Sequence, residues 1–98
     1  MGRIVAGIPW YHKEDYEELR SVFEDGDTLH ETYEEWLASA ESIERQLLGE
    51  GVSVVRVNIR LTEFSRWCAS HGYRLNGKAR SEYASWMARK LDLQGGSV

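Results

Sequence analysis

The chain has 98 residues and a formal net charge of −4, with 42% hydrophobic and 29% charged side chains, 9 glycines, one proline and one cysteine. This balance predicts one compact domain over residues 1–93, and it excludes a second domain with its own core, a collagen-like chain and a disordered chain. A lone cysteine cannot form an internal disulfide. The first apolar stretch is too short for a signal sequence or a membrane span, so we expect a cytoplasmic protein.

Residues 3–10 are mostly β-branched, small or aromatic and predict a short strand that ends near Pro9. Apolar residues at helical spacing predict a helix over 13–23, which the acidic stretch with a glycine at 24–27 interrupts. Thr28 and Glu31 have the spacing of a capping box, which predicts the start of a long helix that ends at the glycines of residues 49–51.

The second half shows the same succession of patterns. Alternating side chains over 52–60 predict a half-buried strand. Thr62 is in position to cap a third helix that ends near Gly72. Apolar periodicity predicts a fourth helix over 78–91, and the glycine-containing segment 94–98 is expected to be a flexible tail.

In order, these elements are strand, helix, helix, strand, helix, helix, which predicts an α+β fold with a two-stranded sheet and four helices. The halves also share aromatic spacing. Tyr16-x-x-Leu19 matches Phe64-x-x-Trp67 after 48 residues, and Tyr33-x-x-Trp36 matches Tyr83-x-x-Trp86 after 50. The match suggests an internal pseudo-repeat. Two strands alone leave exposed edges, which a homodimer would cover by extending the sheet.

Charge is divided unevenly along the chain. Residues 1–50 hold 4 basic and 13 acidic side chains and residues 51–98 hold 8 and 3, so the halves carry formal charges of −9 and +5. One interpretation is that the halves pack together and neutralise each other. The others are that oppositely charged faces bind a partner, or that the basic half binds nucleic acid.

A candidate contact surface lies in the basic half. The alternation over 52–60 puts its polar side chains on one face of the strand, and more cations with an aromatic residue, Tyr73, follow in the next two helices and their connection. Cations beside an aromatic ring are suited to phosphates and bases. The candidate binding residues are Arg56, Asn58, Arg60, Arg74, Lys78 and Arg80.

Few residues point to catalysis. Cys68 and His71 are three residues apart, a spacing at which a thiolate and an imidazole could meet on one helix face. A cysteine on an apolar helix face is, however, usually a small buried hydrophobic residue. His12 and His30 have no partners at metal-ligand spacing. The sequence carries no dinucleotide-binding, Walker or nucleophile-elbow motif. We therefore predict no catalytic residue, no metal and no cofactor.

Several short motifs resemble a family of small uncharacterised bacterial proteins. They are Gly7-Ile8-x-Trp10-Tyr11, Thr32-Tyr33-Glu34-Glu35-Trp36-Leu37, Trp67-Cys68 with Gly72, and Gly77-x-Ala79-Arg80 followed by Tyr83. The chain departs from that pattern at His12, where the family is expected to have arginine. The resemblance implies a bacterial cytoplasmic protein and implies no activity, cofactor or partner.

The sequence thus predicts a non-catalytic interaction module that binds protein, including a second copy of itself. Nucleic-acid binding by the basic half is the alternative. A small-molecule enzyme with a pocket near Tyr11 and His12, or one that uses Cys68, is a further alternative. Membrane association is not expected.

Overall fold

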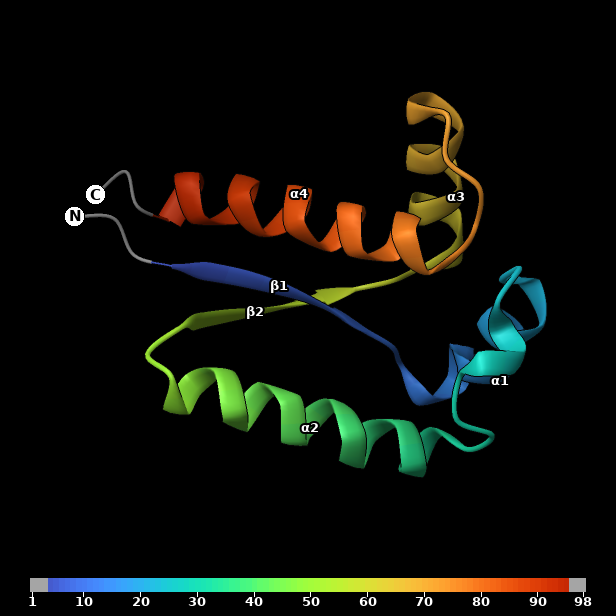
Figure 1. Ribbon diagram of the computed structural model, residues 1–98. Coiled ribbons are helices and arrows are strands. Elements are labelled where there is room, and N and C mark those ends of the chain that lie inside the picture. The colour runs from blue at the N-terminus through green and yellow to red at the C-terminus, as the bar shows by residue number, and fades with distance from the viewer. Residues whose placement is uncertain (1–3, 96–98) are drawn as a thin grey trace.

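The computed structural model describes residues 4–95, and it confirms the α+β class and the predicted order of elements (Figure 1). The predictions for residues 1–3 and 96–98 lie outside the described range. The elements are β1 (Val5–Trp10), α1 (Tyr16–Val22), α2 (Tyr33–Gly49), β2 (Ser53–Asn58), α3 (Leu61–His71) and α4 (Gly77–Gly95), with single 3-10 turns η1 (Lys13–Asp15) and η2 (Gly26–Thr28).

The two strands lie parallel, with Val5 opposite Ser53 and Trp10 opposite Asn58. Figure 1 shows α4 on one face of this small sheet and α2 on the other, so that the strands form the middle of three layers. A parallel pair needs a long connection between its strands, and α1 and α2 supply it. None of the helices within residues 4–95 is long and apolar enough to cross a bilayer.

Aromatic rings fill much of the core between the layers. Trp36 of α2 lies with its ring 5.2 Å from that of Trp10 and 4.8 Å from that of Tyr11, at the carboxyl end of β1. On the other side, Phe64 of α3 packs edge-on against Tyr83 of α4. All five of these aromatic side chains are buried.

The predicted capping box is wrong by four residues. Thr32 caps α2, with its hydroxyl accepting from the Glu35 N–H and the Glu35 carboxylate accepting from the Thr32 N–H. Both threonine–glutamate pairs have the required spacing, but residues 26–28 form η2 instead. The Tyr16 hydroxyl donates to the His30 carbonyl at 2.5 Å and helps hold the segment before α2 out of the helix.

Other boundaries also differ from the prediction. The helix predicted over 13–23 is divided into η1 and α1, and the strand predicted over 52–60 is the shorter β2. Arg60, not Thr62, is the residue before α3, because the ladder to β1 continues to Ile59 and the helix begins directly after it. The last helix continues to Gly95, so residues 94 and 95, predicted in the tail, are helical. Helix propagation adds one backbone hydrogen bond per residue and does not need burial.

Candidate functional site

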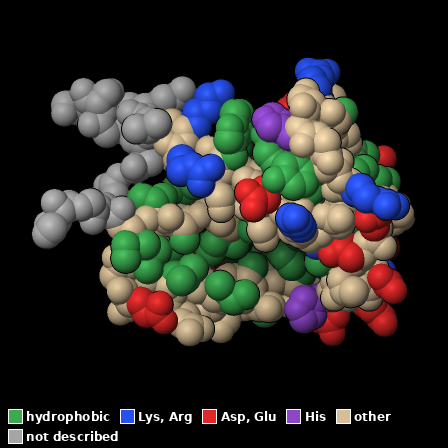
Figure 2. All heavy atoms as spheres, turned by 45° about the horizontal axis from the view of Figure 1, so that its top comes forward, with side chains coloured by type: hydrophobic (Ala, Val, Ile, Leu, Met, Phe, Trp, Pro, Cys, Tyr) green, Lys and Arg blue, Asp and Glu red, His purple; other side chains and the backbone are tan. Residues whose placement is uncertain are grey.

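A groove runs along the free edge of β1, between α2 and the first turns of α4. Its cavity measures about 380 Å³, and its apolar walls are formed by Ile8 and Pro9 of β1 and by Trp36, Ala40 and Ile43 of α2. Figure 2 shows hydrophobic side chains gathered in a band across the middle of this face. We call this feature the β1 groove.

The backbone of β1 offers unpaired groups to the groove. The Ser53 N–H donates to the Ile4 carbonyl and the Ile59 N–H donates to the Trp10 carbonyl, so the even-numbered residues of β1 face β2. Because alternate residues of a strand direct their backbone groups to opposite sides, Val5, Gly7 and Pro9 face away from β2. Within residues 4–95, no hydrogen bond reaches these outward groups.

The edge is only partly protected. Pro9 has no N–H, and its outward position removes no bond of the ladder, which is why a proline is tolerated here. Val5 and Gly7 keep both an N–H and a carbonyl. The corresponding edge of β2 is more polar, because it carries Arg56 and Asn58, both exposed. Charged side chains are a common protection of edge strands, so β1 has the more accessible edge.

Ile43 is the most exposed apolar side chain in the groove wall, with 50% of its surface accessible. It follows Trp36 and Ala40 on the same helix face, at the spacing that the sequence showed. Apolar residues at this spacing are usually covered by the core. The structure covers only the first turns of this helix face, since α2 contacts β2 more than β1 and leaves Ile43 beside the open edge.

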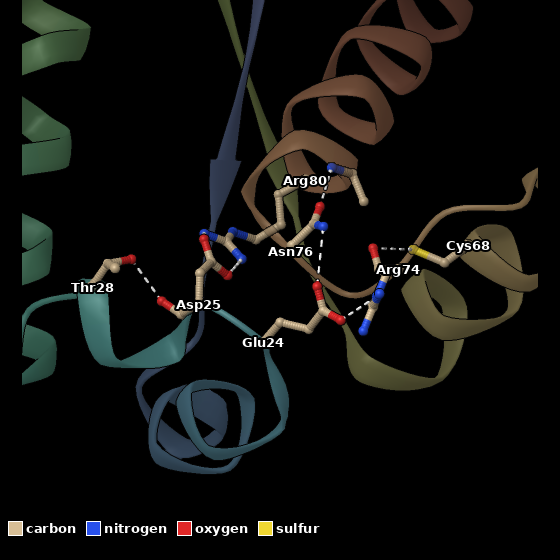
Figure 3. A network of polar contacts seen from close by, with 8 residues as sticks. Glu24, Asp25, Thr28, Cys68, Arg74, Asn76 and Arg80 are labelled. Atoms are coloured by element: carbon tan, nitrogen blue, oxygen red, sulfur yellow. Dashed lines mark hydrogen bonds and ion pairs between the residues drawn. The ribbon is translucent and has the colours of Figure 1, made fainter.

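A buried ion pair closes one end of the groove. Arg80 is only 7% exposed, and its Nη1 and Nη2 donate to the two carboxylate oxygens of Asp25 at 2.9 and 3.0 Å (Figure 3). The guanidinium also lies 4.5 Å from the ring centre of Phe23. Hydrogen bonds from Arg80 hold the pKa of Asp25 below its usual value. The pair is therefore charged but carries no net charge at neutral pH.

Tyr11 lies beside this pair and is 3% exposed. Burial raises the pKa of its hydroxyl to about 12, although Arg80 opposes the shift. A phenol with this pKa stays protonated at neutral pH. The Tyr11 hydroxyl therefore keeps its proton at neutral pH, and its residue lines the closed end of the groove.

A second set of contacts joins the segment between α1 and η2 to the turn before α4. The Glu24 N–H donates to the Leu75 carbonyl at 2.8 Å, and its carboxylate pairs with Arg74 and accepts from the Asn76 amide at 3.3 Å. Asn76 in turn accepts from the Ala79 N–H at the start of α4 (Figure 3). These contacts and the Asp25–Arg80 pair fix the closed end of the groove.

Four of the six predicted binding residues are arginines that pair with carboxylates, and one of them, Arg80, is buried. Arg56 makes two hydrogen bonds to Glu44 of α2 and lies 3.9 Å over the Trp10 ring. Arg60 pairs with Asp15 at 3.0 Å, Arg74 with Glu24, and Arg80 with Asp25. Each of these arginines from the basic half meets an acid from the acidic half. Asn58 and Lys78 are exposed.

Of the residues considered for chemistry, Tyr11 and His30 line the groove, whereas Cys68 and His71 do not. Cys68 is 2% exposed, burial raises the pKa of its thiol, and its Sγ lies 4.0 Å from the Arg74 carbonyl. His71 instead contacts the Trp67 carbonyl through Nδ1 and stacks on the Trp67 ring. Within the part of the chain that the structure describes, no three histidine, cysteine or acidic side chains lie together as metal ligands.

Sequence reasoning named Tyr11 and Arg80 separately and missed that they share one end of a groove. It gave no role to Asp25 or Ile43 in a site. Asp25 is 55 residues from Arg80, and no local pattern connects them.

Comparisons with known protein families, with curated proteins and with solved structures gave no match. The resemblance to a bacterial family therefore assigns no residue a role. The function has to be inferred from the groove of this chain.

Proposed function

We propose that the protein is a non-catalytic interaction module that binds an extended protein segment along the free edge of β1. The observation that carries this proposal is the coincidence of open backbone groups at Val5 and Gly7 with an apolar wall that ends at Ile43. An added strand would form hydrogen bonds with the open backbone groups and would cover the apolar wall. This is a common mode of peptide recognition at a sheet edge.

The charge of the groove supports a protein occupant. Among its described walls, the guanidinium of Arg80 is neutralised by Asp25, and the other titratable side chains are those of His30 and Tyr11. Phosphates need unpaired cations, whereas an extended apolar segment needs none. Nucleic-acid binding is the alternative. Four of its six candidate residues already have carboxylate partners or stacked contacts, so they are not unpaired cations. Titration of labelled oligonucleotides at low salt tests it, and no binding would remove it.

Amide exchange measured by NMR tests the proposal. At protein concentrations where the chain is monomeric, the outward amides of Val5 and Gly7 should exchange rapidly, and they should become protected when a capped hexapeptide of alternating valine and threonine is added. The outward amides of Val54 and Asn58 on the β2 edge are the internal control and should not change. If saturating peptide leaves Val5 and Gly7 unprotected, the proposal is wrong.

A substitution in the wall gives an independent test. Ile43→Glu places a charge beside the bound segment and should weaken peptide binding at least tenfold. Val22→Glu is the matched control, because Val22 is 40% exposed on α1 and does not line the groove. Equal affinities in the two variants would contradict the proposed site.

Small-molecule binding is a second candidate, and one observation favours it. The cavity of about 380 Å³ has the size of a ligand pocket, and Tyr11 and Arg80 bring hydrogen-bond donors to its closed end. His12, the other residue named for such a pocket, does not line it. A thermal shift with phenylacetamide that disappears in Tyr11→Phe would support this candidate.

A further inference from the structure

We infer that the segment bound at the β1 groove is β1 of a second copy, in antiparallel register with Val5 opposite Gly7. This inference rests on the proposed function and names its partner. Two copies related by a two-fold axis at Ala6 would form a four-stranded sheet in the order β2, β1, β1, β2. Each face of that sheet would then carry two helices, as in the usual three-layer α/β arrangement.

The outward backbone groups select this register. In a symmetric antiparallel pair, opposed outward residues exchange N–H and carbonyl groups. Centring the axis on Gly7 would place Pro9 opposite Val5, and the proline ring would then stand where an N–H donor is needed. Centring it on Ala6 pairs Val5 with Gly7 twice, which gives four hydrogen bonds by symmetry and leaves Pro9 beyond them.

Side chains on the α2 side support the same register. Ile4 is 69% exposed, the largest exposure among the large apolar side chains of the described residues. With Ala6 opposite Ala6, Ile4 of one copy lies opposite Ile8 of the other, in the β1 groove. The register thus covers the exposed isoleucine and the apolar wall in the same contact. On the α4 side, the residues that lie against Gly7 are Ala84 and Ala88, whose side chains are small.

The charge of the β1 groove is compatible with a contact between two copies of it. An isologous contact places every group opposite a copy of its own patch, so an unpaired charge near the axis would repel its equivalent. The outward residues of β1 and the α2 wall carry no charged side chain, and Arg80 is neutralised by Asp25. We therefore expect the dissociation constant of the dimer to change little with ionic strength.

A single cysteine at the axis tests the register. Ala6 would face its own copy in a non-hydrogen-bonded pair, where β-carbons are close enough for a disulfide. In a Cys68→Ala background, Ala6→Cys should give a disulfide-linked dimer under mild oxidation. Val54→Cys, on β2 and on the same face of the sheet, should remain monomeric on a non-reducing gel. Equal cross-linking of both variants, or of neither, would overturn the inference.

Sedimentation over a range of protein concentrations tests the partner. The native chain should show a monomer–dimer equilibrium, and Ile4→Lys should weaken it without affecting the fold. Val22→Lys is the control and should behave as the native chain. Val5→Pro removes two symmetry-related hydrogen bonds and should raise the dissociation constant roughly thirtyfold.

The outcomes separate this inference from the proposed function. A chain that stays monomeric at every concentration, but whose Val5 and Gly7 amides are protected by the added peptide, would overturn the second copy as partner and keep the peptide-binding edge. A dimer that Ile4→Lys leaves intact would also overturn the inference. If Val5→Pro does not fold, the Ile4→Lys measurement decides alone.

Discussion

Gly7 of β1 lies directly against the backbone of Ala84 in α4. A β-carbon added at Gly7 would stand 2.2 Å from the Ala84 carbonyl oxygen and 2.8 Å from the β-carbon of Ala88. Both distances are too short for real non-bonded contacts, so an atom would have to move. One of the two atoms belongs to the backbone of α4. The absence of a side chain at Gly7 therefore sets how closely α4 approaches the sheet, and α4 in turn forms one side of the β1 groove.

Replacing Gly7 by alanine should destabilise the fold. Because α4 has to shift away from β1, we expect a loss of about 1–3 kcal/mol in the free energy of unfolding, measured with urea. Gly49→Ala is the matched control, since an added β-carbon there meets no atom within 4 Å. The control should be neutral or stabilising by up to about 1 kcal/mol. A native-like stability of Gly7→Ala would contradict the close packing.

Removing the charge of Asp25 should leave Arg80 buried without its partner. We expect Asp25→Asn to lower the free energy of unfolding by about 2–3 kcal/mol, somewhat less than for a fully buried pair because the Asp25 side chain is 31% exposed. Glu34→Gln breaks the Lys13 pair, whose side chains are 70% and 66% exposed, and should change stability little. Similar losses in both variants would contradict a special role of the buried pair.

Stability should also fall in acid through Asp25. Its pKa in the folded chain lies below the usual 3.8, with hydrogen bonds from Arg80 as the largest cause. The unfolded chain therefore takes up the proton first. The stabilisation that Asp25 contributes is complete above its pKa in the unfolded chain and is lost as the pH falls through its pKa in the folded chain. Urea midpoints measured from neutral pH into acid should show a shallower decline for Asp25→Asn than for the native chain.

Tyr11 should titrate later than an ordinary tyrosine. Burial raises its pKa from 10.0 to about 12, so the folded state holds the proton more tightly than the unfolded state. The contribution of protonated Tyr11 to stability is complete below its pKa in the unfolded chain and is lost as the pH rises through its pKa in the folded chain. Ultraviolet absorbance should show a phenolate step at high pH that is absent in Tyr11→Phe. If Tyr11→Phe instead removes a phenolate step near the pKa of an ordinary tyrosine, Tyr11 is exposed to solvent and the prediction is wrong.

The two threonines singled out as helix caps should respond differently. Thr32 accepts a hydrogen bond from the Glu35 N–H at 3.1 Å, so Thr32→Ala should cost about 1 kcal/mol. Thr62 lies inside the first turn of α3, and Thr62→Ala should leave stability unchanged or slightly raised. Chemical denaturation of both variants checks this, and a larger loss for Thr62→Ala would contradict the observed helix starts.

Periodicity predicted the elements well because it reflects local physics. The alternation over 52–60 and the apolar spacing in α2 and α4 depend on neighbours within a few residues, and the structure has a strand and two helices there. Boundaries were less predictable. Thr28–Glu31 and Thr32–Glu35 are equivalent as local patterns, and a contact from a distant residue, the Tyr16 hydroxyl to the His30 carbonyl, helped decide between them.

The candidate site was predictable only in fragments. Arg80 was named for its charge and Tyr11 as part of a small-molecule pocket with His12, but nothing along the chain indicated that Tyr11 and Arg80 lie at the end of one groove. The charge division, −9 against +5, left several interpretations open. Four arginines of the second half meet acids of the first half within the molecule, and those pairs join residues 12 to 55 positions apart.

The amino-acid sequence by itself determined the class of the fold, the order of its elements and which faces of the helices are apolar, because these follow from side-chain spacing and backbone propensity. Only the tertiary structure decided that the strands lie parallel, that β1 keeps an open edge and that Arg80 is buried with Asp25. These features depend on contacts between residues tens of positions apart, and they form only when α2 and α4 close on opposite faces of the sheet.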